Sequence, residues 1–345
     1  MKIVGCDLHT RYQQVAMLDR ETGELVERRL EHESGEARAF YAALPGPVRV
    51  GIEATGHTRW FERMLAELGH ELWIGDAAQI RASVVRKQKT DARDAAHLLE
   101  LLLSERFPRI WRPTMAERDL RQLVWHRQKL VWMRNAVGNQ LHALAMGEGV
   151  CRKKKLFTKK GRAELDGLGL GVWGSYRRQE LLTMLDRLDG SLHELDHAVA
   201  EQAEQNAAAV LLMTHPGVGP VTSLAFVLTL GPVERFERSK QVVSYLGLNP
   251  REHSSGGRQR LGSISKQGNP MMRSLLVEAG HTAARLDSEL RQDYQRLKLR
   301  RGSGVAKVAI ARKLAVRMYW MLRSPANYAQ LVRMQGSPWA TLVKE

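Results

Sequence analysis

Two carboxylates stand three residues apart in the stretch K-T-D-A-R-D-A at residues 89–95, which opens an apolar, helix-compatible run. On a helix, residues at i and i+3 share a face, so Asp91 and Asp94 are expected to point the same way. The structural alternative is that Asp91 caps the helix and Asp94 lies in its first turn. The surrounding basic residues favour contact with a phosphate polymer. Those predicted to bind nucleic acid are Lys87, Lys89 and Arg93.

Two further carboxylates end or interrupt apolar strands. Asp7 follows the apolar residues 3–6, and Glu53 lies in V-R-V-G-I-E-A-T-G at residues 48–56. A charge in a buried strand is costly unless it is paired, for example with an arginine, or bound to a cation. Carboxylate oxygens suit Mg²⁺, and a pair of ions about 4 Å apart promotes phosphodiester cleavage. The predicted magnesium ligands are Asp7, Glu53, Asp91 and Asp94.

The elements that must position these acids form an alternating pattern. Strands are expected at residues 2–9, 12–18 and 24–30, and the short turns between them predict antiparallel hairpins. A strand at 48–56, a helix at 59–68, a strand at 71–74 and the helix after residue 90 follow. A mixed sheet with helices packed on it is the simplest layered arrangement for this order.

Composition points to a nucleic-acid partner. The 345 residues include 53 Lys and Arg against 37 Asp and Glu, which gives a net charge of +16, and a polyanion is the expected partner. No apolar run approaches the roughly 20 residues of a membrane span, and no signal peptide is apparent, so a cytoplasmic protein without a membrane partner is expected. Cys6 and Cys151 lack metal-ligand spacing and are interpreted as structural.

Long, charged helices are expected between residues 113 and 205. Apolar residues in the second of them alternate by four and three, which is typical of a coiled-coil seam and suggests dimerisation. These seam residues are Leu181, Leu185, Leu188, Leu192, Leu195 and Val199. The basic block at residues 152–162 is either a solvated loop or a phosphate contact, and the phosphate contact is favoured. Its predicted contact residues are Lys153, Lys154 and Lys155.

The order of strands and acids resembles the RNase H-like, RuvC-type nuclease fold. More closely, three motifs resemble the acidic motifs of the DEDD insertion-sequence transposases, which are bridge-RNA-guided recombinases. They are G-C-D at residues 5–7, I-E-A-T-G at 52–56 and T-D-A-R-D-A at 90–95. The resemblance implies that the four predicted acids are the catalytic, metal-binding set, in the order Asp7, Glu53, Asp91, Asp94.

The stretch T-H-P-G-V-G-P at residues 214–220 looks like a helix-hairpin-helix. Gly217 and Gly219 would let the backbone approach a phosphate at the start of the next helix. The alternative is a tight turn between two packed helices. In the DEDD family a P-G-[IV]-G motif opens the C-terminal transposase domain, so the resemblance implies a domain boundary just before it.

A glycine-rich loop with two serines follows the motif G-L-N-P at residues 247–250. Such loops are usually turns or linkers. In the DEDD transposases, however, a serine after G-L-x-P attacks DNA and forms a phosphoserine link. Alignment from this motif implies that Ser255 is the nucleophile, and a single gap would exchange it for Ser254. Arg258 and Lys266 would neutralise the developing charge in a composite site with the four acids.

The predicted fold is α/β plus all-α, in four segments. These are an RNase H-like (RuvC-type) mixed-sheet DEDD domain at 1–112, a helical coiled-coil region at 113–205, a mainly helical transposase domain with a helix-hairpin-helix-like motif at 206–330, and a tail at 331–345.

The resemblance implies a transposase that cleaves and rejoins DNA through metal-assisted serine attack. Its implied partners are the element ends and target DNA, a bridge RNA, and copies of itself in a dimer or tetramer. Two alternatives are a RuvC-like, Mg²⁺-dependent nuclease that uses water and a non-catalytic nucleic-acid-binding module.

Overall fold

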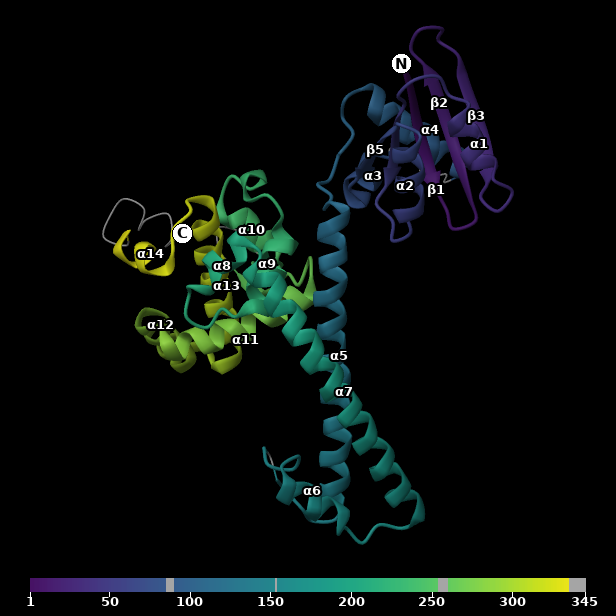
Figure 1. Cartoon of the computed structure of the whole chain (residues 1–345). Coiled ribbons are helices and arrows are strands. Elements are labelled where there is room, and N and C mark those ends of the chain that lie inside the picture. Colours follow the sequence, from purple (N-terminus) through teal and green to yellow (C-terminus); the bar gives the residue numbers. More distant parts are fainter. Residues whose placement is uncertain (85–89, 153, 254–259, 335–345) are drawn as a thin grey trace. The chain divides into compact units, whose positions relative to one another are not determined.

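The computed structural model describes residues 1–84, 90–152, 154–253 and 260–334 (Figure 1). The chain divides into two compact units, Met1–Arg112 and Pro113–Glu345. Among the helices of the described residues, none is long and apolar enough to cross a membrane.

The first unit is built on a five-stranded mixed sheet in the order β3-β2-β1-β4-β5. β1 pairs antiparallel with β2 and β2 with β3, whereas β1, β4 and β5 run parallel. The predicted strands and the mixed sheet are therefore confirmed, and the sheet is consistent with an RNase H-like domain. The strands are β1 (Lys2–Leu8), β2 (Tyr12–Asp19), β3 (Leu25–Glu31), β4 (Arg49–Glu53) and β5 (Glu71–Gly75).

Helices cover both faces of this sheet. The predicted helices α2 and α4 are present, and two seven-residue helices, α1 and α3, were not predicted. The four helices are α1 (Glu36–Ala42), α2 (Arg59–Glu67), α3 (Ala77–Ser83) and α4 (Asp91–Leu103). On β1, Val4 and Cys6 join one hydrophobic cluster, and Ile3 joins the other, with Leu98 and Leu99 of α4. β1 is thus a central strand buried on both faces.

Gly5 allows α4 to pack closely on β1. A Cβ atom at this position would lie 2.2 Å from the carbonyl oxygen of Ala95 and 2.4 Å from the amide nitrogen of Leu99. Because side chains alternate along a strand, Gly5 and Asp7 face the same side of the sheet. The contact therefore brings the end of β1 near the beginning of α4.

The second unit contains two long helices, α5 (Met115–Gly147) and α7 (Val172–Glu204), which lie side by side and are joined through α6 (Lys159–Asp166) (Figure 1). Thr114 and Glu117 form a capping box at the beginning of α5. Leu185 and Leu188 of the predicted seam are buried with Leu141 of α5. The leucine seam therefore packs against a helix of the same chain, and dimerisation stays a prediction.

Most of the remaining helices share one core, in which α11 packs against α13 and α9 against α8, whereas Leu290 of α12 joins a smaller cluster with Ala283 and Ile310. These helices are α8 (Ala207–Met213), α9 (Pro220–Leu230), η1 (Val233–Arg235), α10 (Ser239–Tyr245), α11 (Pro270–Leu286), α12 (Ser288–Arg301), α13 (Ser303–Arg323) and α14 (Tyr328–Met334). Two short strands, β6 (Pro250–Glu252) and β7 (Leu261–Ile264), pair antiparallel. α14 runs past residue 331, where the tail was predicted to begin, and Leu331 is buried in this core.

A buried polar cluster attaches α14 to this core. The Arg317 guanidinium donates to the Asp287 carboxylate at 2.9 Å, and the Tyr328 hydroxyl donates to the same carboxylate. The His215 ring, at the turn after α8, lies 4.7 Å from the Tyr328 ring, measured between centroids. Asp287, Arg317 and His215 are almost fully buried. The charges of Asp287 and Arg317 thus compensate each other inside the unit.

Candidate active site

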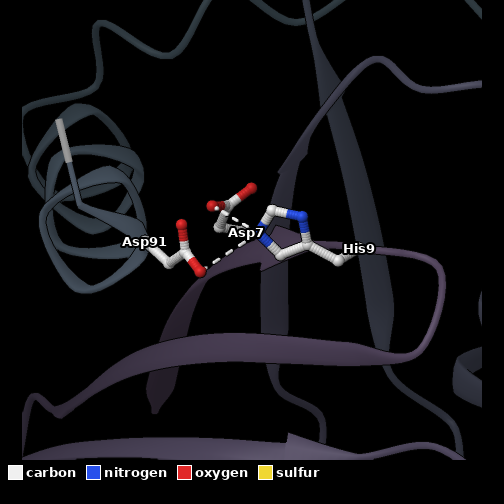
Figure 2. A group of neighbouring side chains, drawn as sticks. All are labelled: Asp7, His9 and Asp91. Atoms are coloured by element: carbon white, nitrogen blue, oxygen red, sulfur yellow. Dashed lines mark hydrogen bonds and ion pairs between the residues drawn. The ribbon is translucent and has the colours of Figure 1, made fainter.

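Two of the four predicted acids meet around a histidine at the C-terminal end of β1, the central strand of the first unit's sheet. Figure 2 shows Asp7 and Asp91 pointing toward the His9 ring from separate elements. His9 Nε2 lies 3.1 Å from Asp7 Oδ2 and 3.5 Å from Asp91 Oδ2. Asp7, His9 and Asp91 each offer one possible ligand atom, and these three atoms all lie within 4.8 Å of one another. Among the described residues, this is the group of His, Cys, Asp or Glu side chains that could hold a metal ion.

The local sequence explains how the two carboxylates meet. Asp7 is the penultimate residue of β1, and Asp91 is the first residue of α4. Thr90 caps this helix, because its hydroxyl accepts a hydrogen bond from the Arg93 amide at 3.4 Å. Asp91 is therefore not the cap, and together with Asp94 it lies in the first turn of the helix.

The surroundings of Asp7 raise its proton affinity. Burial raises the pKa of half-buried Asp7, and the negative charges of Asp94 and Asp91 raise it further, while His9 lowers it. Clustered carboxylate oxygens of this kind fit a divalent cation, which would offset both the burial and the repulsion. The donor set therefore fits a metal site.

Tyr12 also holds Asp91, at the same carboxylate oxygen that faces His9. Its hydroxyl donates to Asp91 Oδ2 at 2.8 Å, and this hydrogen bond is the main reason that the Tyr12 pKa is raised. The Arg29 guanidinium stacks on the Tyr12 ring, 3.7 Å from its centroid, and Arg29 pairs with Glu31 at 3.0 Å. Asp91 is thus fixed by a network that begins on β3.

Sequence reasoning assigned no role to His9 or Tyr12. The sequence feature that could have identified them is the four-residue turn between β1 and β2. The His9 amide closes this turn by donating to the Tyr12 carbonyl at 3.0 Å. Their rings then lie 4.6 Å apart, measured between centroids. A short hairpin after an acidic strand end brings the first residue of the next strand back to that end.

Glu53 lies outside the group of three. It is the last residue of β4. Ile52 of β4 pairs with Cys6 of the parallel strand β1, and Glu53 and Asp7 are the residues that directly follow this pair. Its carboxylate lies 4.0 Å from the Arg81 guanidinium of α3. The arginine partner considered from the sequence is therefore present. Asp94 acts on Asp7 through its charge.

Comparison with known proteins identifies the family. A family model of the DEDD IS110 type, described as "Transposase", matches residues 4–147, and the "Transposase IS116/IS110/IS902 family" model matches residues 209–295. The "Probable family 20 transposase" of Pseudomonas aeruginosa is 29% identical over 335 residues, which cover 93% of this chain and 96% of the relative. The chain belongs to the IS110/IS116 family of DEDD transposases.

Other relatives agree with this assignment. The "Transposase for insertion sequence element IS1111A" of Coxiella burnetii is 27% identical, covering 95% of this chain and 91% of the relative. The "Pilin gene-inverting protein" of Moraxella lacunata is 35% identical over 91 residues, or 25% of this chain and 28% of the relative. An IS110/IS116-family transposase is an enzyme that acts on DNA, and the DEDD family depends on divalent metal ions. The Asp7, His9 and Asp91 group fits that dependence.

Several predicted DNA-contacting residues of this transposase are exposed. They are Arg93, Lys154, Lys155 and Lys266. Other predicted residues lie outside the described part of the chain. They are Lys87, Lys89, Lys153, Ser254, Ser255 and Arg258.

The two glycines of the predicted helix-hairpin-helix differ in their surroundings. Gly217 has a φ of +87°, and a Cβ there would lie 2.5 Å from the amide nitrogen of Ala283 in α11. Gly219 is the N-cap of α9 and faces open space. Gly217 therefore serves the packing of the turn, as the structural alternative proposed, and Gly219 leaves the backbone accessible at the helix N-terminus.

A β-hairpin brackets the serine loop of the transposase. The His253 amide donates to the Arg260 carbonyl at 2.9 Å, and the Ser265 amide donates to the Asn249 carbonyl at 2.8 Å. At its base, Gly247 has a φ of +67°, and a Cβ there would lie 2.0 Å from the Gln267 carbonyl oxygen, so the backbone conformation and the close contact both require glycine. The ends of the segment that carries Ser254 and Ser255 are thus fixed.

Proposed function

We propose that the first unit of this transposase cleaves phosphodiester bonds at the C-terminal end of β1, where Asp7 meets Asp91. The observation that supports this proposal is the convergence of these two carboxylates, from β1 and α4, within a group whose ligand atoms lie within 4.8 Å. Divalent cations, with Mg²⁺ as the one that carboxylates favour, would supply charge stabilisation at the scissile phosphate.

The remaining predicted ligands, Asp94 and Glu53, extend the site. Asp94 is close enough to raise the pKa of Asp7 by its charge. Glu53 forms a 4.0 Å ion pair with Arg81, and it would bind the cation after this ion pair opens. The Arg81 side chain is 82% exposed, and exposed pairs contribute little stability, so the exchange is inexpensive. Tyr12 keeps Asp91 oriented.

We propose that strand joining uses a serine of the loop after Pro250, with Ser255 as the nucleophile and Ser254 as the alternative. A Ser Oγ–phosphorus bond would form, the bond from phosphorus to one DNA oxygen would break, and that oxygen would leave as a protonated hydroxyl. Attack by another DNA hydroxyl reverses these changes, so the ester stores the bond for rejoining. Arg258 and Lys266 would neutralise charge on the phosphate.

The proposed partners are DNA at the element ends and target, a structured bridge RNA, and further copies of the chain. The net charge of +16 supports a polyanion partner and does not distinguish DNA from RNA. We propose the helical region at 113–205 as a nucleic-acid-binding segment through Lys154 and Lys155, which are exposed.

The carboxylates are tested by Asp7→Asn and Asp91→Asn in the full chain. Each should lower the rate of DNA cleavage about a thousandfold, because a cation ligand acting on the transition state is worth several kcal/mol. DNA affinity, measured by filter binding, should persist. Glu67→Gln is the matched control, since this exposed residue pairs with Arg38 away from the group. Cleavage that survives in both variants would refute the site.

The serine is tested by incubating the purified chain and its bound nucleic acid with labelled element-end DNA and a divalent cation, followed by denaturing electrophoresis. A protein-linked DNA band that Ser255→Ala removes and Ser254→Ala retains supports the proposal. The reverse pattern assigns Ser254. Free nicked DNA in both variants and the parent would instead indicate a nuclease that uses water.

A further inference from the structure

His9 lies where a cation ligand would lie. Its Nε2 atom is 3.1 Å from Asp7 Oδ2 and 3.5 Å from Asp91 Oδ2. Neighbouring ligands around an octahedral cation at about 2.1 Å are about 3 Å apart. The separation from Asp7 matches this spacing, and the separation from Asp91 exceeds it by about 0.5 Å. The nitrogen therefore lies beside the two carboxylate oxygens as a third candidate ligand atom.

The hairpin holds the imidazole in this position. The His9 amide closes the turn by donating to the Tyr12 carbonyl at 3.0 Å, and the two rings lie 4.6 Å apart. Tyr12 in turn donates to Asp91. The same hairpin thus orients one carboxylate and one nitrogen, while the His9 side chain remains 37% exposed and open to a cation from solvent.

We infer that His9 is a nitrogen ligand of the catalytic site, which gives this transposase a higher affinity for a first-row transition cation such as Mn²⁺ than for Mg²⁺. The inference rests on the proposed function, because it concerns the same cation site. Carboxylates bind both cations, whereas imidazole nitrogen favours transition cations over Mg²⁺. The imidazole that binds is neutral, with its proton on Nδ1 and the Nε2 lone pair toward the cation.

A competing role for His9 makes the opposite prediction. An imidazolium between Asp7 and Asp91 would act as an internal partner of the two carboxylates, and a cation would have to displace it. Removing the ring would then strengthen cation binding, whereas removing a ligand weakens it. The sign of the change in affinity separates the two roles.

The test is calorimetric titration of the full chain with MnCl₂ and with MgCl₂, for the parent, His9→Ala and the control His193→Ala. His193 is exposed on α7. His9→Ala should weaken Mn²⁺ binding about tenfold and Mg²⁺ binding far less, because only the transition cation gains from nitrogen. His193→Ala should match the parent. Pulsed EPR of bound Mn²⁺ should show coupling to ¹⁴N that His9→Ala abolishes.

Unchanged or tighter Mn²⁺ binding in His9→Ala, or ¹⁴N coupling that survives in it, would overturn the inference and leave the carboxylate site intact. If neither cation binds the parent chain, the proposed cation site itself fails. Circular dichroism of His9→Ala checks that a loss of affinity reflects the ligand rather than unfolding. His9→Gln, which keeps a polar side chain without a ring nitrogen, should behave like His9→Ala in all three measurements.

Discussion

Tyr12 orients the proposed metal ligand Asp91 without being a ligand itself. Its hydroxyl bonds Asp91, and its ring lies under the Arg29 guanidinium. Since Asp91 stands at the exposed start of α4, this hydrogen bond is a main restraint on the direction of its carboxylate.

We expect Tyr12→Phe to lower the rate constant of DNA cleavage about tenfold, because a hydrogen bond to a charged group contributes about 1.5 kcal/mol. Single-turnover cleavage at saturating DNA measures this, and DNA affinity should not change. Tyr176→Phe is the control, since Tyr176 is 61% exposed on α7. An unchanged rate would mean that Asp91 is oriented without Tyr12.

His215 makes the stability of the second unit depend on pH. Burial lowers the pKa of its imidazole from 6.5 to about 4, against the hydrogen bond to the Pro216 carbonyl, which raises it. Between these two pH values the unfolded chain binds a proton that the folded chain does not. Stability therefore falls as the pH drops from 6.5 toward 4, by about 3 kcal/mol at most, and this loss is absent above pH 6.5.

His215→Asn, whose amide can still donate to the Pro216 carbonyl, should flatten this pH dependence. Urea unfolding of the parent and the variant at pH 7 and pH 5 tests it, with exposed His193→Asn as the control. If the variant lost as much stability as the parent between these pH values, another group would be responsible.

At the scale of elements, the contact between β1 and α4 decides where the acids meet. This contact requires glycine at position 5, because a Cβ there would lie 2.2 Å from the carbonyl oxygen of Ala95. The partner at that distance is helix backbone, which cannot move aside without displacing α4 from the sheet.

Gly5→Ala should therefore destabilise the first unit by about 1–3 kcal/mol, the usual cost of overpacking, and should reduce cleavage by separating Asp7 from Asp91. Gly190→Ala should instead stabilise α7 by up to about 1 kcal/mol, because Gly190 is helical and has open space around it. Urea unfolding with hydrogen exchange assigns each change to its unit. Equal effects of the two substitutions would contradict the packing argument.

Element types were more predictable than their partners. Short apolar segments joined by tight turns identified the strands, and the apolar run after Asp94 identified α4. Helices α1 and α3 escaped because each has seven residues and buries only one or two side chains, too few for a helical period. The pairing of Glu53 with Arg81 depends on where α3 packs, and the leucine seam has the same spacing whether its partner is α5 or a second chain.

The candidate site was predictable to the same extent. Asp7 and Asp91 were predicted because a carboxylate at the end of an apolar strand and one at the start of a helix are both recognisable in the sequence as candidate metal ligands. His9 and Tyr12 acquire their roles only when the turn between β1 and β2 closes and brings their rings to 4.6 Å. Sequence spacing alone does not carry that side-chain geometry.

At the scale of the whole molecule, the net charge of +16 predicts strong salt dependence of DNA binding. Replacing both Lys154 and Lys155 with Gln should reduce the slope of log affinity against log salt by about 2, at roughly 0.9 per phosphate contact. Arg38→Gln is the control, because Arg38 already pairs with Glu67 at 3.0 Å. An unchanged slope in the double variant would place the contacts elsewhere.

The attachment of α14 also bears on the inheritance of the mobile element. Tyr328 donates a hydrogen bond to Asp287 beside Arg317. A gene copy with a premature stop codon before position 328 encodes a chain that keeps these buried charges and loses their hydroxyl partner and the apolar cover of Leu331. We expect such a chain to be less stable and to be removed faster by cellular proteases, although every proposed catalytic residue is intact.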